Sequence, residues 1–309
     1  MKIKKPKFWD IKFHTFFSLL LWPISFIYQI LLSIKKTFVK EKIFSIPIIC
    51  IGNIYLGGTG KTPISMKIYE ILKNYKKPII IKKNYSNHHD EIDLIKKYAK
   101  VIVSKKRDDA IKEAENKKFN LAILDDGFQD FEIKKDLNII CFNDEQGIGN
   151  GQTIPSGPLR ENLSSLKNCQ IVLINGKKNL EFENKLKSYN SKLIFFYFSY
   201  KIKNQNEFKN RKLICFAGIG NTENFFQLLK INHLNVIKEI SFPDHYKYTQ
   251  SELDNLLQLE KKYKAKLVTT EKDYLRISSI QRRGFGVIPI KVQIEDENIL
   301  LENIKKFIK

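Results

Sequence analysis

Apolar residues along this chain fall into short runs that alternate with amphipathic stretches. Runs rich in β-branched residues are typical of strands buried on both faces of a sheet. The predicted strands of the first part are Ile48–Ile51, Pro78–Ile81, Val101–Val103, Leu121–Leu124, Leu137–Phe142, Ile171–Ile174 and Leu193–Phe198. Within Lys61–Tyr75 the apolar side chains form one helical stripe. The alternation predicts an α/β fold, with a parallel sheet covered by helices.

A polar stretch, Tyr200–Lys212, separates this series from a second one, which opens with a predicted strand at Leu213–Ala217. Further predicted strands are Val236–Ile240, Lys266–Thr269 and Val287–Ile290, and predicted helices are Asn221–Leu229, Gln250–Lys262 and Ile299–Ile308. We therefore expect a membrane-associated N-terminal helix in residues 1–44, a larger α/β domain in 45–200 and a smaller α/β domain in 201–309.

The N-terminal segment Phe16–Ile34 has no charged residue over a length that could cross a hydrocarbon core as a helix. Lysines flank it on both sides, so the positive-inside rule does not orient a crossing. Pro23 is expected to kink or break the helix near its middle. Charge on both flanks favours a helix lying in one leaflet at the membrane surface. A transmembrane span and a buried core helix are the alternatives.

The formal net charge is +21 at pH 7, which suits nucleic acid, an anionic membrane surface or a phosphorylated substrate. Lysine-rich solvated faces are an alternative cause of part of this charge. No aromatic-basic recognition motif accompanies the lysines, so nucleic acid is not a predicted partner. The cysteines stand mostly in apolar runs without a C-x-x-C pair, which predicts reduced core thiols and neither disulfides nor a zinc site. They are Cys50, Cys141, Cys169 and Cys215.

The stretch Ile51–Thr62, IGNIYLGGTGKT, links a predicted strand to a predicted helix. It ends in Gly-Lys-Thr like a phosphate-binding loop, but Tyr55 stands where the spacing G-x-x-x-x-G-K-[ST] requires glycine. Three glycines at positions 57, 58 and 60 would let backbone N–H groups surround phosphate oxygens at the helix N-terminus. Lys61 would then reach the β- and γ-phosphates, and Thr62 would ligate Mg²⁺. A tight strand-to-helix turn with an incidental lysine is the alternative.

A pair of carboxylates, Asp125 and Asp126, stands at the end of the apolar strand in LAILDDGFQ. Ligands of open parallel sheets bind at the carboxyl ends of strands. The pair is therefore predicted to hold magnesium opposite the glycine loop. An aspartate that caps a following helix is the alternative.

Two further clusters contain imidazoles beside carboxylates. Asn87–Glu91 holds His88, His89, Asp90 and Glu91, and Phe242–Tyr246 places His245 in a predicted turn. A surface loop explains each cluster equally well. A kinase with a hydroxyl acceptor uses a carboxylate to take the proton, and an imidazole can tune it. Asp90 with His245 would supply that pair if the two parts of the chain close over a shared cleft.

Together these pieces resemble the tetraacyldisaccharide 4′-kinase family of lipid A biosynthesis, over nearly the whole chain. The matching segments are IGNIYLGGTGKTP, HDE at 89–91, ILDDGFQ at 123–129, GNGQTIPSGPLRE at 149–161, FAGIGNTENFF at 216–226, FPDHYKYT at 242–249 and VTTEKDYLR at 268–276. The glycine loop and the P-x-G-P-L-R-E segment are highly specific to this family.

The resemblance implies a P-loop kinase domain and a smaller C-terminal domain that closes the active-site cleft. It implies ATP and Mg²⁺ as cofactors and phosphorylation of the 4′-hydroxyl of a tetraacylated glucosamine disaccharide 1-phosphate. The expected location is the cytoplasmic face of the bacterial inner membrane, with an anionic membrane surface as partner and no obligate protein partner.

The resemblance also implies residue roles. Asp90 would be the base in a dyad with His245, and Asp125 and Asp126 would lie near the metal and the γ-phosphate. Glu161 is a weaker candidate metal ligand beside Thr62 and the two aspartates. The residues implied in nucleotide binding are Gly52, Asn53, Gly57, Gly58, Thr59, Gly60, Lys61 and Thr62.

The chain departs from the family pattern at three places. One is the segment between Tyr85 and Asp90, which is short and suggests a trimmed hairpin. Lys82-Lys83-Asn84-Tyr85 stands where the family usually has S-R-G-Y, and Asp130 stands where it usually has histidine. The alternative function is a membrane-associated P-loop ATPase that acts as a positioning switch. Many such proteins carry a signature lysine before the paired glycines, where this chain has Leu56.

Overall fold

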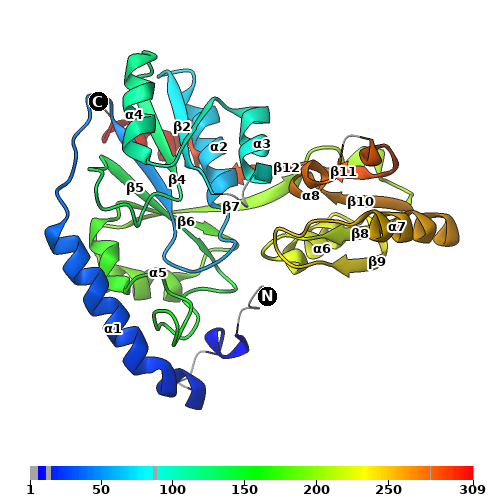
Figure 1. Cartoon of the computed structure of the whole chain (residues 1–309), viewed down its shortest axis with the longest axis horizontal. Helices are drawn as coiled ribbons and strands as arrows, with labels where there is room; N and C mark the ends of the chain where they lie inside the picture. Colours follow the sequence, from blue (N-terminus) through cyan, green and yellow to red (C-terminus); the bar gives the residue numbers. More distant parts are fainter. Residues whose placement is uncertain (1–5, 12–14, 86–88, 279, 309) are drawn as a thin grey trace. The chain divides into compact units, whose positions relative to one another are not determined.

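The computed structural model describes residues 6–11, 15–85, 89–278 and 280–308. The chain divides into two compact units (Figure 1). Unit 1 comprises Met1–Asn84, Ala99–Ser199 and Ile294–Lys309, and unit 2 comprises Tyr85–Tyr98 and Tyr200–Gln293. Two of the four boundaries fall within strands, β7 (Ile194–Ile202) and β12 (Ile290–Ile294), and the other two fall at Asn84/Tyr85 and Tyr98/Ala99.

Unit 1 is built on an eight-stranded sheet in the order β12-β7-β6-β5-β1-β4-β2-β3. Its other strands are β1 (Ile48–Gly52), β2 (Pro78–Lys83), β3 (Val101–Ser104), β4 (Leu121–Asp125), β5 (Leu137–Asn143) and β6 (Ile171–Asn175). All pairs from β3 through to β7 are parallel. The seven predicted strands are therefore confirmed, and β1, β4 and β5 are buried along their whole length, as continuous apolar runs predict.

Helices surround this sheet in Figure 1. Besides α1 (Phe16–Phe38) they are α2 (Lys61–Leu72), α4 (Arg107–Asn116), α5 (Leu180–Lys187) and α9 (Glu297–Lys305). The predicted stripe of α2 is buried at Ile64, Ile68, Ile71 and Leu72. Tyr75, which the stripe included, lies beyond the end of α2 and is exposed. Short 3₁₀ helices span Lys7–Trp9, Leu163–Asn168, Gln205–Glu207 and Gln281–Gly284.

The N-terminal helix α1 spans Phe16–Phe38 and continues through Pro23, so of the expected kink or break the break is wrong and the kink stays a prediction. Contacts on both sides of the proline hold the helix: Ser18 Oγ donates to the Ser156 carbonyl at 3.1 Å, and Ser25 Oγ donates to the Thr153 carbonyl at 2.9 Å. Only these two serines of α1 are buried.

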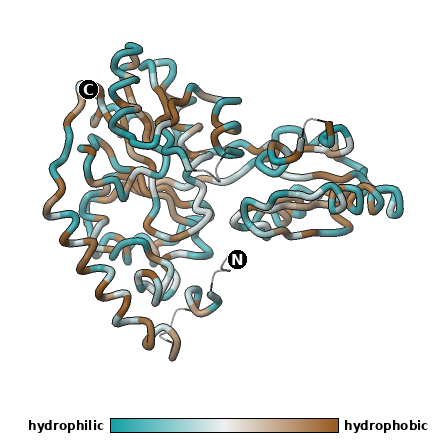
Figure 2. The backbone as a smooth tube through the Cα atoms, viewed as in Figure 1, coloured by the Kyte–Doolittle hydropathy of each residue, from teal (hydrophilic) through white to brown (hydrophobic). Residues whose placement is uncertain are grey.

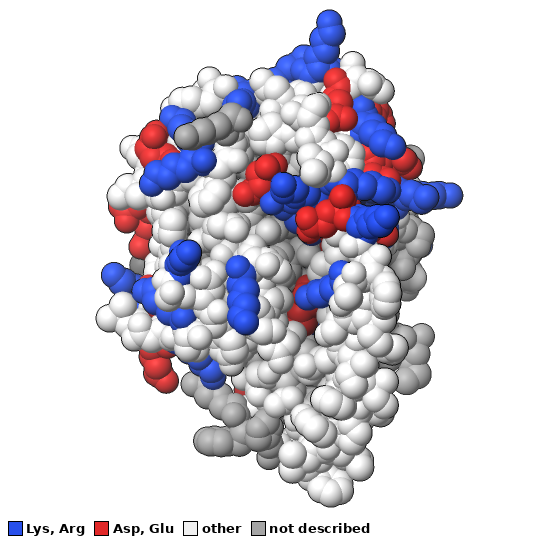
Figure 3. Space-filling view, turned by 90° about the vertical axis from the view of Figure 1, so that its left-hand side faces the viewer, with Lys and Arg blue, Asp and Glu red and all other residues white. Residues whose placement is uncertain are grey.

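The apolar side chains of α1 face outward. By length and composition α1 could cross a membrane, but only 11% of its most apolar window is buried, which excludes the core-helix alternative. Figure 2 shows the hydrophobic character of this helix. Figure 3 looks at the side on which α1 lies in Figure 1, and a white area without charged side chains occupies the lower right of that face. A helix held by small polar residues and apolar on its outside suits a membrane surface.

Unit 2 contains a four-stranded parallel sheet in the order β11-β10-β8-β9. Its strands are β8 (Lys212–Ala217), β9 (Asn235–Ser241), β10 (Lys266–Thr270) and β11 (Gly286–Ile288), and its helices are α3 (His89–Tyr98), α6 (Thr222–Ile231), α7 (Gln250–Tyr263) and α8 (Glu271–Arg276). The prediction of one strand over Val287–Ile290 is wrong, because these residues belong to two different strands. The chain leaves β11 before Pro289, which lacks the N–H for a ladder bond, and enters β12 of the larger sheet.

The central strand β8 separates two small cores. Leu213 and Cys215 belong to the cluster that contains Phe225 and Phe226 of α6, whereas Phe216 belongs to the cluster that contains Leu253 of α7. Side chains alternate across a strand, so one run can supply both faces. All four cysteines of the chain are buried and free.

The two units do not contain the same residues as the segments 1–44, 45–200 and 201–309 expected from the sequence. Helix α3 lies in unit 2, because it packs on α8 through ion pairs such as Glu91–Lys272 at 2.7 Å. Helix α9 lies in unit 1, where Leu300 and Ile304 are buried and Glu297 pairs with Lys67 at 3.0 Å. These returns of the chain are long-range contacts that local patterns do not encode.

Candidate active site

The glycine loop leaves the carboxyl end of β1 and enters α2. Asn53 is fully buried, and its Nδ2 donates to the carbonyls of Tyr55 at 2.5 Å and Gly57 at 3.2 Å, which fixes the turn. Gly57 and Gly60 have φ of 128° and 87°, values that side-chain-bearing residues rarely adopt. Gly60 is the N-cap of α2, so the helix N-terminus opens directly onto the loop.

Tyr55, the residue that breaks the usual loop spacing, is buried and structural. Its hydroxyl donates to Asp10 Oδ1 at 2.7 Å, and burial, followed by Asp10, raises the pKa of the Tyr55 phenol. The next residue, Leu56, donates its N–H to the Pro158 carbonyl at 2.8 Å. The middle of the loop is thus attached to the 149–161 segment rather than turned toward phosphates.

Gly52 is required by packing, since a Cβ there would lie 2.4 Å from the Cβ of Phe128. The close approach brings the segment after β4 against the start of the glycine loop. The carboxylates of that segment are consequently held beside the loop.

Asp125 lies at the centre of the site and is fully buried. It is the register partner of Ile51 on β1 and of Lys82 on β2, so three strands end around it. Its carboxylate accepts hydrogen bonds from the Thr62 and Ser65 hydroxyls, both at 3.0 Å. It also pairs with the Lys82 ammonium at 2.5 Å, where Lys82 is itself buried.

Asp126 follows in the left-handed conformation, with φ of 58°, and faces two cations. Arg160 Nη1 lies 2.9 and 3.2 Å from its two carboxylate oxygens, and Lys61 Nζ lies 3.7 Å from Oδ1. Burial alone would raise the pKa of Asp126, but Lys61 and Arg160 outweigh it and lower that pKa. Burial lowers the pKa of Lys61, although Asp126 opposes the shift.

Arg107, at the start of α4, holds the backbone beneath both aspartates. Its Nη2 donates to the carbonyls of Asp125 at 3.0 Å and Asp126 at 2.7 Å, and its Nη1 pairs with Asp130 at 3.3 Å. The departure at position 130 therefore supplies a carboxylate for a buried guanidinium. This contact stabilises the turn that aims the two aspartates.

Glu161 is buried and has other partners. Lys36 of α1 pairs with its Oε2 at 2.6 Å, and Gln129 donates to its Oε1 at 2.9 Å. Within the described part of the chain, no group of three or more His, Cys, Asp or Glu side chains could hold a metal. The role of Glu161 as a metal ligand stays a prediction.

The donors around the loop fit a nucleotide with Mg²⁺. Thr62 and Asp125 offer the hard oxygens that Mg²⁺ prefers, with phosphates completing its shell. Thr59 Oγ1 and Asn53 Oδ1 are buried and have no hydrogen-bond partner among the described residues. A Cβ added at Gly57 would meet open space, so this side of the loop has room for a ligand.

The second catalytic candidate, Asp90, lies in unit 2 at the first turn of α3. His245 Nδ1 lies 3.3 Å from its Oδ1, and Arg276 donates to its Oδ2 through Nη2 at 2.6 Å and Nε at 3.0 Å. Burial would raise the pKa of Asp90, but His245 and Arg276 hold it well below its usual range. Both members of the predicted pair belong to one unit, so no closure is needed to form it.

Arg276 links this pair to a buried network around Asp273. Its Nη1 donates to Asp273 Oδ1 at 2.8 Å, and Asp273 also accepts the Gly218 N–H at 3.0 Å and the Tyr248 hydroxyl at 2.8 Å. His245 has φ of 53°, and its N–H donates to the Gly218 carbonyl at 3.0 Å. Three segments distant in sequence therefore fix the orientation of Asp90 and His245.

The remaining residues of the 87–91 cluster are accounted for separately. Asn87 and His88 lie outside the described residues. His89 begins α3 and is exposed, and Glu91 pairs with Lys272. Of the described residues 89–91, Asp90 is thus the one that contacts an imidazole, that of His245.

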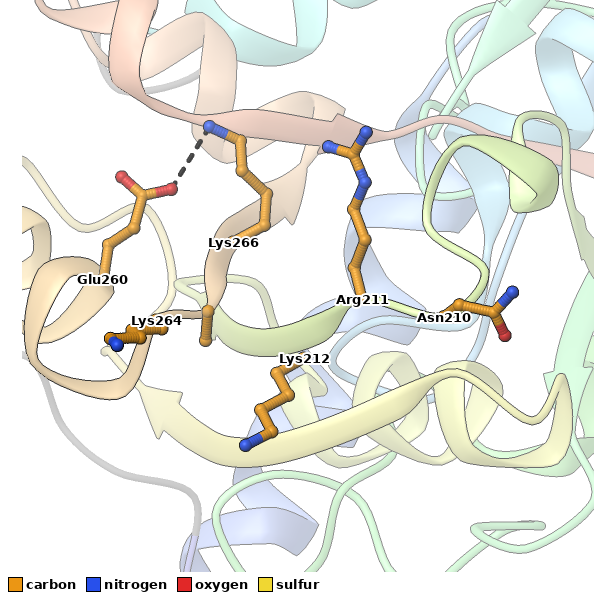
Figure 4. A pocket seen from close by; sticks show the side chains of 7 residues that line it. Asn210, Arg211, Lys212, Glu260, Lys264 and Lys266 are labelled. Carbon is orange, nitrogen blue, oxygen red and sulfur yellow. Dashed lines mark ion pairs between the residues drawn. The ribbon is translucent and has the colours of Figure 1, made fainter.

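A shallow hollow of about 570 Å³ in unit 2 contains none of the predicted site residues (Figure 4). Arg211 and Lys212 line it, and Lys266 pairs there with Glu260 at 3.2 Å. It lies where β8 and β10 begin, whereas ligands of parallel sheets bind where strands end. We assign it no part in the site.

Comparison with known proteins decides the family. The model of a protein family described as "Tetraacyldisaccharide-1-P 4'-kinase" matches residues 17–309 of this chain. The chain belongs to this family. Relatives named tetraacyldisaccharide 4'-kinase include one from Pelagibacter ubique (strain HTCC1062), 41% identical over 99% of this chain and 98% of the relative. Another, from Rickettsia bellii (strain OSU 85-389), is 34% identical over 99% of both chains.

A solved member of the family shares the fold. The crystal structure of LpxK from Aquifex aeolicus in complex with ATP matches with a TM-score of 0.71 and 24% identity, over 94% of this chain and 99% of that one. The α/β architecture with a phosphate-loop sheet is therefore the family fold.

Several residues of the site were not predicted from the sequence. Arg160 and Arg276 stand inside quoted motifs, so their motif positions were the available signal. Arg107 follows β3 without any motif, and Lys82 was read only as a departure from the family pattern. Their roles depend on which segments the sheet brings together.

Proposed function

We propose that this chain transfers the γ-phosphoryl group of ATP to the 4′-hydroxyl of a tetraacylated glucosamine disaccharide 1-phosphate. As a member of this kinase family, it is an ATP- and Mg²⁺-dependent enzyme of lipid A biosynthesis. The observation that carries the proposal is that one chain holds both a phosphate loop with its Thr62–Asp125 contact and a carboxylate–imidazole pair.

On the nucleotide side, the loop N–H groups and Lys61 would hold the β- and γ-phosphates. Thr62 and Asp125 would hold Mg²⁺, which when bound neutralises charge on the phosphates. Arg160, now paired with Asp126, carries a guanidinium fork suited to phosphate oxygens. In unit 1, therefore, the chain binds and orients the donor.

On the acceptor side, the 4′-hydroxyl would lose its proton to the dyad as its oxygen attacks the γ-phosphorus and ADP leaves. Asp90 is ionised, since Arg276 and His245 lower its pKa. A carboxylate with a low pKa is a weak base alone, so we propose that Asp90 acts together with the imidazole of His245, which lies 3.3 Å away.

The two halves of this chemistry belong to different units. We propose that catalysis requires unit 2, which holds the dyad and most of the smaller C-terminal domain 201–309, to close on the bound substrates so that the dyad reaches the acceptor hydroxyl. Closure of this kind also excludes water from phosphoryl transfer, as in other kinases.

The activity test uses labelled ATP. Incubation of purified protein with ATP labelled at the γ-phosphate, Mg²⁺ and a tetraacyldisaccharide 1-phosphate in detergent should yield a labelled lipid. If a folded, ATP-binding protein gives no labelled lipid, while its ATP turnover responds to membranes alone, the positioning-switch alternative is correct.

Members of this family are membrane-associated, and we propose that α1 attaches this chain to the cytoplasmic face of the inner membrane. Leu20 and Ile27 are 62% and 57% exposed and lie two turns apart on one face of the helix. Burial of each apolar side chain in a bilayer would contribute about 1.5–3 kcal/mol. Lysines at both ends of α1 would meet anionic headgroups.

The double substitution Leu20→Glu with Ile27→Glu should lower binding to phosphatidylglycerol–phosphatidylethanolamine vesicles by at least about tenfold, because both side chains leave the apolar face. Cosedimentation measures it. Ile231→Glu, at an exposed apolar position of α6, is the matched control and should bind like the unchanged protein. Unaltered binding of the double variant would contradict the role of α1.

A further inference from the structure

We propose that the Lys82 ammonium neutralises the Asp125 carboxylate and that Mg²⁺ must compete with Lys82 for it. Lys82 would thereby set how strongly nucleotide binding depends on Mg²⁺. The inference rests on the proposed function, because it assumes that ATP and Mg²⁺ bind at the glycine loop. It goes beyond that function by assigning a role to a position at which this chain departs from the family pattern.

The sheet register fixes the contact. Lys82 and Asp125 are direct partners on the neighbouring parallel strands β2 and β4, at the carboxyl ends where ligands bind. Their side chains are 5% and 0% exposed, and Nζ lies 2.5 Å from Oδ2. A buried ion pair of this kind is held in place, since removal of one partner leaves an uncompensated charge.

Asp125 is also the carboxylate best placed for Mg²⁺. The Thr62 hydroxyl, expected on Mg²⁺ in a phosphate loop, contacts the same Oδ2 that Lys82 contacts. A metal held by Thr62 and Asp125 therefore meets an oxygen that already has an ammonium group beside it. Two cations competing for one carboxylate weaken each other's binding.

Lys82 has the opposite effect on the nucleotide itself. Lys82 compensates the charge of Asp125, which would otherwise repel the phosphates of a nucleotide without metal. A serine at this position, as the family usually has, leaves Asp125 with the Thr62 and Ser65 hydroxyls and its full negative charge. Lys82 thus strengthens the binding of nucleotide without metal and weakens the binding of Mg²⁺.

The test measures binding rather than turnover. Isothermal titration calorimetry gives the Kd of a non-hydrolysable ATP analogue with excess EDTA and with saturating Mg²⁺. The Kd measured with EDTA divided by the Kd measured with Mg²⁺ expresses the coupling between metal and nucleotide. In Lys82→Ser this ratio should rise by about tenfold or more, through weaker metal-free binding and a lower Mg²⁺ concentration at half-saturation.

Three further variants separate charge from structure. Lys82→Met keeps the apolar stem and should reproduce the serine result, whereas Lys82→Arg keeps the charge and should restore the original ratio. Lys42→Ser removes another lysine of unit 1 that pairs with an aspartate, Asp108 at 2.6 Å, and should leave the ratio unchanged.

An unchanged ratio in Lys82→Ser and Lys82→Met would overturn the inference. So would weakening of both binding constants together with a lower melting temperature, since that indicates a purely structural role. Absence of any nucleotide binding by the unchanged protein would instead contradict the proposed function, so the two failures are distinguishable.

Discussion

Replacing Asp90 with asparagine should lower kcat by about 10²-fold or more while the Kd for ATP changes little, because the carboxylate acts on the acceptor hydroxyl and the nucleotide binds elsewhere. Asp90 faces His245 and Arg276 within unit 2, whereas the phosphate loop lies in unit 1. Steady-state kinetics with lipid acceptor and calorimetry with ATP measure the two quantities.

The matched control for this variant is Asp93→Asn. Asp93 lies on the same helix, is half-exposed and pairs only loosely with Lys96, at 3.8 Å. Its replacement should leave kcat and the melting temperature unchanged. Near-normal turnover of Asp90→Asn would remove Asp90 from the role of base.

A second variant distinguishes catalysis from folding, since Asp90→Asn also removes one of the two carboxylates that pair with Arg276. His245→Gln breaks the dyad at a side chain that is 20% exposed, so its structural cost is smaller. If the two residues act as one unit, the double variant loses little more activity than either single variant. Fully additive losses would indicate two separate functions.

Replacing Lys61 with methionine should lower kcat/KM for ATP by about 10²–10³-fold, the scale for removing one group that stabilises transition-state charge. Methionine keeps most of the stem, so the loop and α2 should remain folded. Lys61 Nζ lies 3.7 Å from Asp126 Oδ1, and the Lys61 side chain is only 13% exposed. This burial lowers the pKa of Lys61. A phosphate bound in the loop would replace the water contacts that the Lys61 ammonium loses by burial.

Lys67→Met is the matched control for Lys61→Met, because it removes the same charge from the same helix. Lys67 pairs with Glu70 at 3.5 Å and Glu297 at 3.0 Å, outside the loop. It should keep kcat/KM within the error of the unchanged enzyme. Retention of most activity by Lys61→Met would mean that the glycine loop does not hold the transferred phosphate.

The glycine loop and the helix α1 both pack against residues that are distant in the sequence. Tyr55 replaces an expected glycine because its ring fills a buried place and its hydroxyl reaches Asp10. The same 149–161 segment that receives Leu56 also receives Ser18 and Ser25 of α1. The glycine loop, the 149–161 segment and α1 are therefore packed together within unit 1.

The sequence by itself determined the strands of the larger sheet except β12, the strand–loop–helix of the phosphate site and the place of Asp125 and Asp126. These features are local: a buried strand is a short apolar run, and parallel strands bring their carboxyl ends to one edge. Family motifs added the Asp90–His245 pair, which no spacing in the chain could have indicated.

Only the tertiary structure decided which side chains meet. Lys82 reaches Asp125 across 43 positions, and Arg276 reaches Asp90 across 186. Strand register and helix packing bring such residues together, and neither is written in the local period of apolar positions. For the same reason α3 joins unit 2, α9 joins unit 1 and α1 continues through Pro23, each held by contacts with segments far away in the sequence.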